Sequence, residues 1–313
     1  MDEFVLTPKE VKNQIKKTRH NAELVLYFVL SILGLVVLES YLSMGSGSSE
    51  AIDEIMNILL QTADEPDSIM ISVIAGIIKL LFFNGIVALV FVVLRTIVEM
   101  YRYYAGQMAY SIRVSEHNFP EIYEKVKEYT RLLELDKEPE VYVRQMNGSL
   151  NAYTSWVFGK PFIQLNAEIV DLAYMENKDF DTVMFVLAHE FGHVYLHHVH
   201  LHYNFLPILA NVVPGLGIIL YMMLSRAREY SCDRVAQALT NDKNHVECMM
   251  LLGVGRHAYR HIDVENYLQE INNNHNKVEL MFRWFTNFFS THPIMPFRTK
   301  AILDPEKNSG RLV

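Results

Sequence analysis

Residues 180–200 read FDTVMFVLAHEFGHVYLHHVH. Up to residue 193 the stretch contains no proline and carries apolar side chains at helical spacing, which predicts a buried, regular helix. On such a helix His189 and His193 project from one face and can bind one metal ion together. Glu190 is offset from His189 by about 100 degrees, outside the ligand set but near enough to accept a proton from an activated water. This HExxH arrangement is typical of zinc hydrolases.

The later histidines of this stretch do not extend the site. His197 lies eight residues beyond His189, about 12 Å along the axis, and a zinc ion with bonds of about 2.1 Å cannot reach both. A longer HExxHxxGxxH pattern is excluded because Leu196 and Val199 occupy its last two positions. A third ligand must therefore come from elsewhere. Since the chain has 13 histidines, a chance HExxH is the competing interpretation.

Composition bounds the class of protein. The chain has 313 residues, half of them apolar, which is enough for one catalytic domain and membrane segments. The net charge of -8, without a concentrated basic face, argues against a nucleic-acid partner. Cys232 and Cys248 lack CxxC spacing, which indicates reduced thiols in a domain that faces the cytosol.

Two apolar runs predict a multi-pass protein of the cell membrane. Residues 24–42 and 69–98 are each long enough to span the bilayer as a helix. Residues 1–23 are basic, and basic residues also follow the second run, whereas the loop 43–68 is acidic and has no Lys or Arg. This asymmetry predicts that the loop is external and that the domain 99–313 faces the cytoplasm.

The rest of the chain indicates a mainly α domain with a small β-sheet, an α+β fold. Pro120 starts a pattern of helical spacing that extends to residue 133. Residues 141–165 are rich in β-branched and aromatic residues with turn signals between them, which predicts a small β-meander. Residues 241–287 are helix-compatible with a polar break at 272–276.

A third ligand is available in SRAREYSCDRVAQALT, residues 225–240. A helix there places Glu229 and Asp233 on one face, where Glu229 can supply a carboxylate ligand. Asp233, one turn away, can accept the free ring N–H of a zinc-bound histidine and fix its tautomer. The alternative is that both acids pair with neighbouring arginines on a solvated helix surface, and the residues alone leave the two interpretations even.

Three motifs in this order resemble a known family. HEFGH at 189–193, SRAREYSCD at 225–233 and THPIMPFR at 291–298 follow two N-terminal spans, as in the HtpX-like membrane zinc metallopeptidases, relatives of the CAAX prenyl proteases. The resemblance covers most of the chain and implies a zincin-type domain with one zinc ion. The residues it implies are His189, His193 and Glu229 as zinc ligands, Glu190 as general base, His292 and Arg298 as oxyanion stabilisers, and Asn151, Ala152 and Tyr153 as the start of an edge strand that binds substrate.

The chain departs from the family between the first two motifs, where family members place a pair of spans and this chain has one apolar run, 205–224. A single crossing would put Glu229 on the other side of the membrane from the histidines. We therefore expect Pro214, Gly215 and Gly217 to break the run into two halves, each too short to cross. The run would be re-entrant, or interfacial against the domain.

These observations lead to an expected function. The chain is expected to be a membrane-bound zinc endopeptidase that cuts membrane or misfolded proteins from the cytosolic side, with polypeptides and the lipid bilayer as its partners. A dedicated processing peptidase for one precursor is an alternative, and a noncatalytic adaptor braced by zinc is another. Glu190 argues against the adaptor, because a structural site needs no base.

Overall fold

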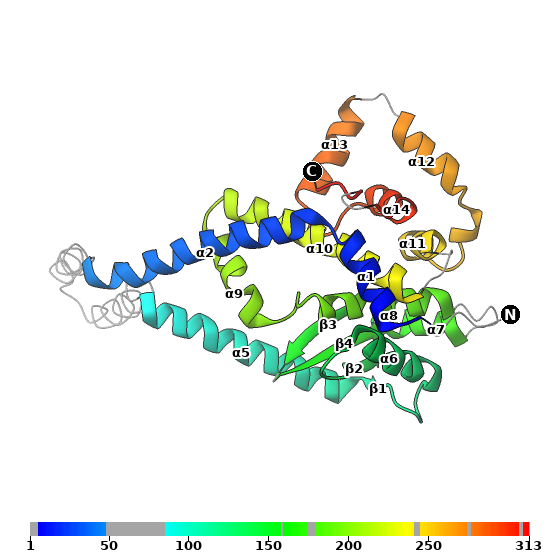
Figure 1. The fold of residues 1–313 in the computed structure, drawn as a ribbon, viewed down its shortest axis with the longest axis horizontal. Coiled ribbons are helices and arrows are strands. Elements are labelled where there is room, and N and C mark those ends of the chain that lie inside the picture. Colours follow the sequence, from blue (N-terminus) through cyan, green and yellow to red (C-terminus); the bar gives the residue numbers. More distant parts are fainter. Residues whose placement is uncertain are drawn as a thin grey trace, which may run out of the picture.

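A computed structural model places a small sheet beside a larger group of helices (Figure 1). Helices α2 (Asn21–Gly47) and α5 (Gly85–Tyr110) extend away from both and contact each other. The mainly helical class with a small sheet is thus confirmed. The structure describes residues 6–47, 85–157, 159–174, 180–240, 245–273, 277–306 and 309–312.

Helices α8 (Phe180–Tyr195) and α10 (Leu216–Thr240) pack directly on each other at the centre of the domain. Both predicted helices are therefore present. Helix α8 is buried on most sides because its residues are apolar almost all round. At Gly192 an added Cβ would lie 3.0 Å from the Cα of Cys232 on α10, so the glycine of HEFGH permits this close approach.

The sheet has four strands in the order β1-β2-β4-β3. The predicted β-meander is wrong, because β2 pairs with β4 in parallel and only β3 and β4 form a hairpin. After β2 the chain turns through Asn147 and Gly148, both at positive φ, and the Glu168 carboxylate accepts the Gly148 N–H (2.6 Å). This turn carries the chain to the sheet edge, so β3 becomes an edge strand. The strands are Ile112–Arg113 (β1), Glu140–Arg144 (β2), Ala152–Val157 (β3) and Lys160–Asn166 (β4).

Among the described residues, one helix is long and apolar enough to cross a membrane, Asn21–Ser40 within α2. It lies near the predicted first span, and 28% of its most apolar window is buried in the protein. A second span is not shown. Residues 48–84, which include most of the predicted acidic loop and the start of the second predicted span, lie outside the described residues.

The apolar run 205–224 folds as a helical hairpin. Helix α9 (Leu201–Leu209) and the 3-10 turn Ala210–Val212 lead into a bend, after which α10 begins. Gly215 has φ +74°, and a Cβ on Gly217 would collide with the Ala210 carbonyl oxygen, so glycines make the bend. Both α9 and α10 contact α2. The chain therefore returns to α8, while the relation of the hairpin to a bilayer stays a prediction.

The remaining helices complete the domain around α8 and α10. Helix α6 (Pro120–Leu133) starts at its proline and buries its apolar stripe, as predicted. Between 245 and 288 the described residues form three α-helices, and Gly255 (φ +89°) follows the first of them, α11 (His245–Val254), at a break that the sequence did not predict. Most of the predicted polar break at 272–276 lies outside the described residues. The other elements are Pro8–Thr18 (α1), Ala167–Tyr174 (α7), His245–Val254 (α11), the 3-10 turn Tyr259–His261, Val264–Asn273 (α12), Lys277–Phe288 (α13) and Met295–Leu303 (α14).

Candidate metal centre

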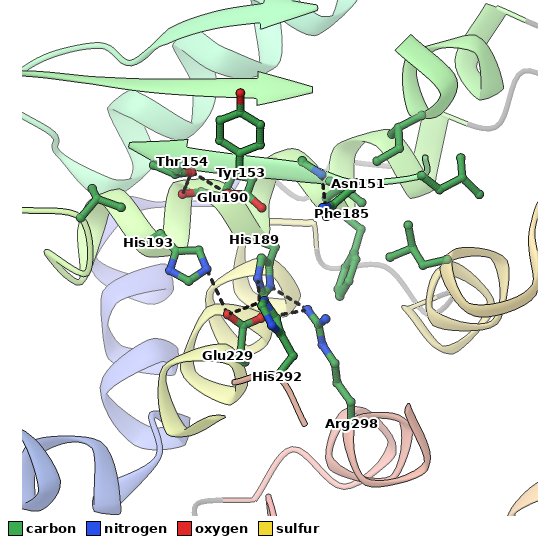
Figure 2. Close-up of a pocket in the computed structure, with 16 residues that line it drawn as sticks. Asn151, Tyr153, Thr154, Phe185, His189, Glu190, His193, Glu229, His292 and Arg298 are labelled. Atoms are coloured by element: carbon green, nitrogen blue, oxygen red, sulfur yellow. Dashed lines mark hydrogen bonds and ion pairs between the residues drawn. The ribbon is translucent and has the colours of Figure 1, made fainter. Parts of the chain in front are cut away.

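Two imidazoles and one carboxylate converge between α8 and α10 (Figure 2). Nε2 of His189 lies 3.4 Å from Oε2 of Glu229, and Nε2 of His193 lies 3.6 Å from Oε1 of the same carboxylate. A tetrahedral zinc ion with bonds of about 2.1 Å holds its ligand atoms about 3.4 Å apart. Both histidine–carboxylate separations are therefore close to those of zinc ligands.

Two of the three candidate ligands carry the charge state that a metal cation requires. Burial would raise the pKa of Glu229, but His189, His193 and Arg298 lower it by more, so the carboxylate is ionised at neutral pH. Burial holds the pKa of His193 well below its usual value, which leaves this imidazole neutral. Burial and the Arg298 charge would lower the pKa of His189, but the bonds to Asp233 and Glu229 raise it to about 9, so metal binding would displace a proton from this ring.

Asp233 supports His189 from the side opposite Glu229. Oδ1 of Asp233 lies 2.9 Å from Nδ1 of His189, and a hydrogen on Nδ1 would leave Nε2 to bind a metal. Arg298 of α14 donates to both Asp233 oxygens at 2.7 Å, through Nε and Nη2. The residue expected to orient a histidine thus lies in contact with one, and it is held in turn by a bidentate arginine.

Cys232 offers a competing donor. His189, His193 and Cys232 have potential ligand atoms within 4.8 Å of one another. However, the Cys232 sulfur lies 3.5 Å from Nδ1 of His198, and this Nδ1 contacts Nδ1 of His193. The sulfur is therefore on the side of the His193 ring that is turned away from Glu229. Burial raises the pKa of this thiol well above its usual value, and a neutral thiol is a poor ligand. The Glu229 set is therefore the better metal site.

Glu190 lies in the same cavity as the three ligands and is held by a residue that the sequence analysis missed. Its carboxylate accepts a hydrogen bond from the Thr154 hydroxyl on β3, at 2.6 Å. Glu190 is 6% exposed, and burial raises its pKa. A carboxylate with a raised pKa is a stronger base. Thr154 lies on the predicted edge strand, two residues after Ala152, but no local pattern predicts that its hydroxyl meets Glu190.

The predicted edge strand borders the cavity. The outer edge of β3 is unpaired in the described sheet, and Asn151, Ala152 and Thr154 line a cavity of about 330 Å³ together with the ligands. The Tyr153 ring instead points to the other face of the sheet, where its hydroxyl accepts from Gln107 at 2.5 Å (Figure 2). Tyr153 can therefore contribute to this edge only through its main chain.

His292 and Arg298 come to the cavity from beyond α13. Nε2 of His292 lies 3.6 Å from Oε1 of Glu229, and the His292 side chain is 66% exposed at the mouth of the cavity. Arg298 lies deeper, and two of its three guanidinium nitrogens donate to Asp233. The two residues expected to act alike thus have different surroundings.

Comparison with known proteins agrees with this geometry. The model of peptidase family M48 matches residues 116–214 and 202–306, together more than half of the chain. No curated protein and no solved structure matches. The matched segments contain the α8 histidines, the α10 carboxylates and Arg298, and the chain belongs to peptidase family M48, a family of metallopeptidases.

Proposed function

We propose that the protein is a membrane-bound zinc endopeptidase that hydrolyses peptide bonds of membrane or misfolded proteins, as HtpX-like members of the family do. The observation that carries this proposal is the convergence of His189, His193 and Glu229 at zinc-ligand separations, with the Glu190 carboxylate in the same cavity. A binding site that only braced the fold would have no use for a buried base beside an open cavity.

The residues that line the cavity have different roles in hydrolysis. Zinc, when bound, supplies Lewis acidity that makes water more acidic and polarises a carbonyl. Glu190 takes the proton of the attacking water as the new C–O bond forms, and passes this proton to the amine as the C–N bond breaks. Thr154 holds the Glu190 carboxylate in place through its hydrogen bond.

His292 and Arg298 take different roles in this mechanism. The exposed His292 ring at the cavity mouth can donate to the oxyanion that develops on the carbonyl. Arg298 is engaged with Asp233 through two nitrogens, so its main contribution is to hold Asp233 against His189. The shared oxyanion role expected from the family resemblance is thereby assigned mainly to His292.

Substrate would bind as an added strand on the outer edge of β3. Main-chain groups of Asn151, Ala152 and Tyr153 can pair with an extended peptide, which gives affinity without strong dependence on the peptide's side chains. Apolar side chains beyond the ligands can receive one residue of the peptide. They are Leu150, Ile169, Phe185, Val186 and Leu252.

The surface of α2 supports a membrane location. Val25, Phe28, Ile32 and Val36 are each more than half exposed along this helix. A soluble protein rarely leaves so continuous an apolar surface in water. The proposal places α2 in the bilayer, with the basic N-terminal residues and the catalytic domain on the cytoplasmic side.

The test is cleavage of an unfolded protein by the zinc-loaded full-length chain in detergent. We expect the wild type to cut, Glu190→Gln to bind zinc without cutting, and His193→Ala to lose both zinc and activity. His257→Ala, which removes an exposed imidazole elsewhere, is the matched control and should cut normally. Undiminished cleavage by Glu190→Gln would overturn the proposed mechanism.

A further inference from the structure

Helix α8 ends in a motif that brings two histidines together. The His198 N–H donates to the His193 carbonyl (2.9 Å), and the His197 N–H donates to the Val194 carbonyl (3.1 Å). His197 has φ +62°. These are the bonds and the left-handed residue of a Schellman motif, in which the second residue after the cap lies against the third residue from the helix end. Here those two residues are His198 and His193.

The contact in this motif is polar. Nδ1 of His198 lies 3.2 Å from Nδ1 of His193, and Nε2 of His198 lies 3.0 Å from Oε1 of Glu23. Glu23 belongs to the first turn of α2, far from α8 in sequence. All three side chains are largely buried, so the row from His193 to Glu23 is shielded from solvent.

The chemistry of Glu23 fixes the direction of both hydrogen bonds. Glu23 is paired with Arg19, whose Nε donates to it at 3.0 Å, so the carboxylate is an acceptor and Nε2 of His198 must carry a hydrogen. Nδ1 of a neutral His198 is then an acceptor, and the two groups that face it are Nδ1 of His193 at 3.2 Å and the weaker thiol donor of Cys232 at 3.5 Å. In this arrangement Nδ1 of His193 donates to His198. Nε2 of His193 is left without a hydrogen, on the side of Glu229.

Glu23 is itself held firmly. Arg19 of the α1–α2 connection donates to it through two nitrogens, and the Ser231 hydroxyl of α10 donates to it as well. Glu23 lies outside the residues matched by the family model, which begin at 116. The start of the apolar helix α2 is thus connected to the metal centre by a continuous row of hydrogen bonds.

We propose that His198 and Glu23 are positioning residues for His193, so that the first apolar helix supplies part of the metal centre. The inference rests on the proposed metal site. It gives His193 a support equivalent to the one that Asp233 gives His189, and supports of this kind change metal affinity by about 10- to 100-fold. It also fixes the metal centre level with the N-terminal end of the candidate span.

Two amide variants separate positioning from space filling. Asparagine at 198 places an oxygen where histidine has Nδ1, so it can still accept from His193 while losing Glu23. Glutamine reaches the position of Nε2, so it can still bond Glu23 while offering His193 no acceptor at that position. His197→Gly is the matched control, because it removes a neighbouring exposed imidazole and leaves a residue that favours positive φ.

The measurement is zinc affinity of the full-length protein in detergent, by competition with a chromophoric chelator, together with visible spectra of the Co²⁺ form. We expect His198→Gln to bind zinc about 10- to 100-fold more weakly with altered cobalt bands. His198→Asn should keep a zinc affinity close to that of the wild type, and Glu23→Gln should lose less zinc affinity than His198→Gln. The zinc affinity of His197→Gly should equal that of the wild type.

Each outcome has one meaning. Equal zinc affinity of the two amide variants, or no change in either, overturns the inference. Unfolding of the chelator-treated variants separates a folding defect from a metal defect, since positioning predicts that the difference between the amides appears only when zinc is present. If the wild type itself binds no zinc, the proposed function fails instead.

Discussion

The two histidines of the candidate metal centre come from one helix, yet different regions of the molecule hold them. His189 is held by Asp233 and Arg298, which lie within the residues matched by the family model. His193 is held by His198, which turns back from the end of α8, and through it by Glu23 of α2. We call these the Asp233 arm and the His198 arm. The comparison teaches that one HExxH motif can draw support from both the peptidase domain and the apolar helix that precedes it.

The arms also differ in charge and in what their loss leaves behind. The Asp233 arm contains a full ion pair, with Asp233 1% exposed and Arg298 18% exposed at their side chains. The His198 arm reaches its charge, Glu23, through a neutral ring. Removing one partner of a buried ion pair leaves an uncompensated charge, whereas removing a neutral ring leaves a cavity and unmade hydrogen bonds. The Asp233 arm should therefore matter more for folding.

The largest expected effect comes from breaking the Asp233 arm. Asp233→Ala removes the acceptor of His189 and leaves Arg298 without its partner, so we expect a loss of about 3–5 kcal/mol in the free energy of unfolding. Zinc affinity should fall as well. Chemical denaturation with and without chelator measures both effects.

A double variant sharpens this result. Asp233→Ala combined with Arg298→Met removes the unpaired charge, so stability should return in part while zinc affinity stays low. Asp171→Ala, at an exposed aspartate of α7, is the control and should stay within about 0.5 kcal/mol of the wild type. A stable Asp233→Ala variant with normal zinc affinity would contradict the role given to this arm.

A smaller effect, shared by both arms, is expected at Gly192. An added Cβ would lie 3.0 Å from Cα and 3.2 Å from Sγ of Cys232, so in Gly192→Ala α10 must move locally by a few tenths of an ångström. We expect a loss of about 1–3 kcal/mol, typical of overpacking. Gly106→Ala is the control, because no atom lies within 4 Å of its added Cβ and the helix should gain slightly. A Gly192→Ala protein as stable as the Gly106→Ala protein would show that the helices tolerate separation.

The two arms differ in how far the sequence predicts their contacts. His189, His193, Glu229 and Asp233 lie at helical spacing on two helices, so local geometry is enough to place each pair on one face. The contact of His198 with His193 depends on how α8 ends, and a histidine at the left-handed position 197 is not a usual end signal. Glu23 precedes α8 by more than 150 residues, and no local pattern predicts that contact.

The order of the strands in the sheet could not be predicted from local sequence either. Strand-forming residues and turn signals between 141 and 165 predicted strands there, but the order of the strands depends on where the turn at Gly148 sends the chain. A Glu168 carboxylate from the following helix stabilises that turn, which is a tertiary contact. For the same reason Thr154 was missed, since only the observed register brings its hydroxyl to Glu190.

The smallest expected effect is at Thr154, which lies outside both arms and separates zinc binding from catalysis by Glu190. Thr154→Val removes the hydrogen bond that stabilises the charged form of Glu190. Because that bond lowers the pKa of Glu190, its loss should raise the pKa further and move the acid limb of kcat/KM to higher pH. Zinc affinity should not change, because Thr154 contacts neither histidine arm. Thr154→Ser keeps the hydroxyl and should keep the acid limb of kcat/KM at its wild-type pH. If the acid limb moves equally in both variants, the shift comes from packing and not from the hydrogen bond.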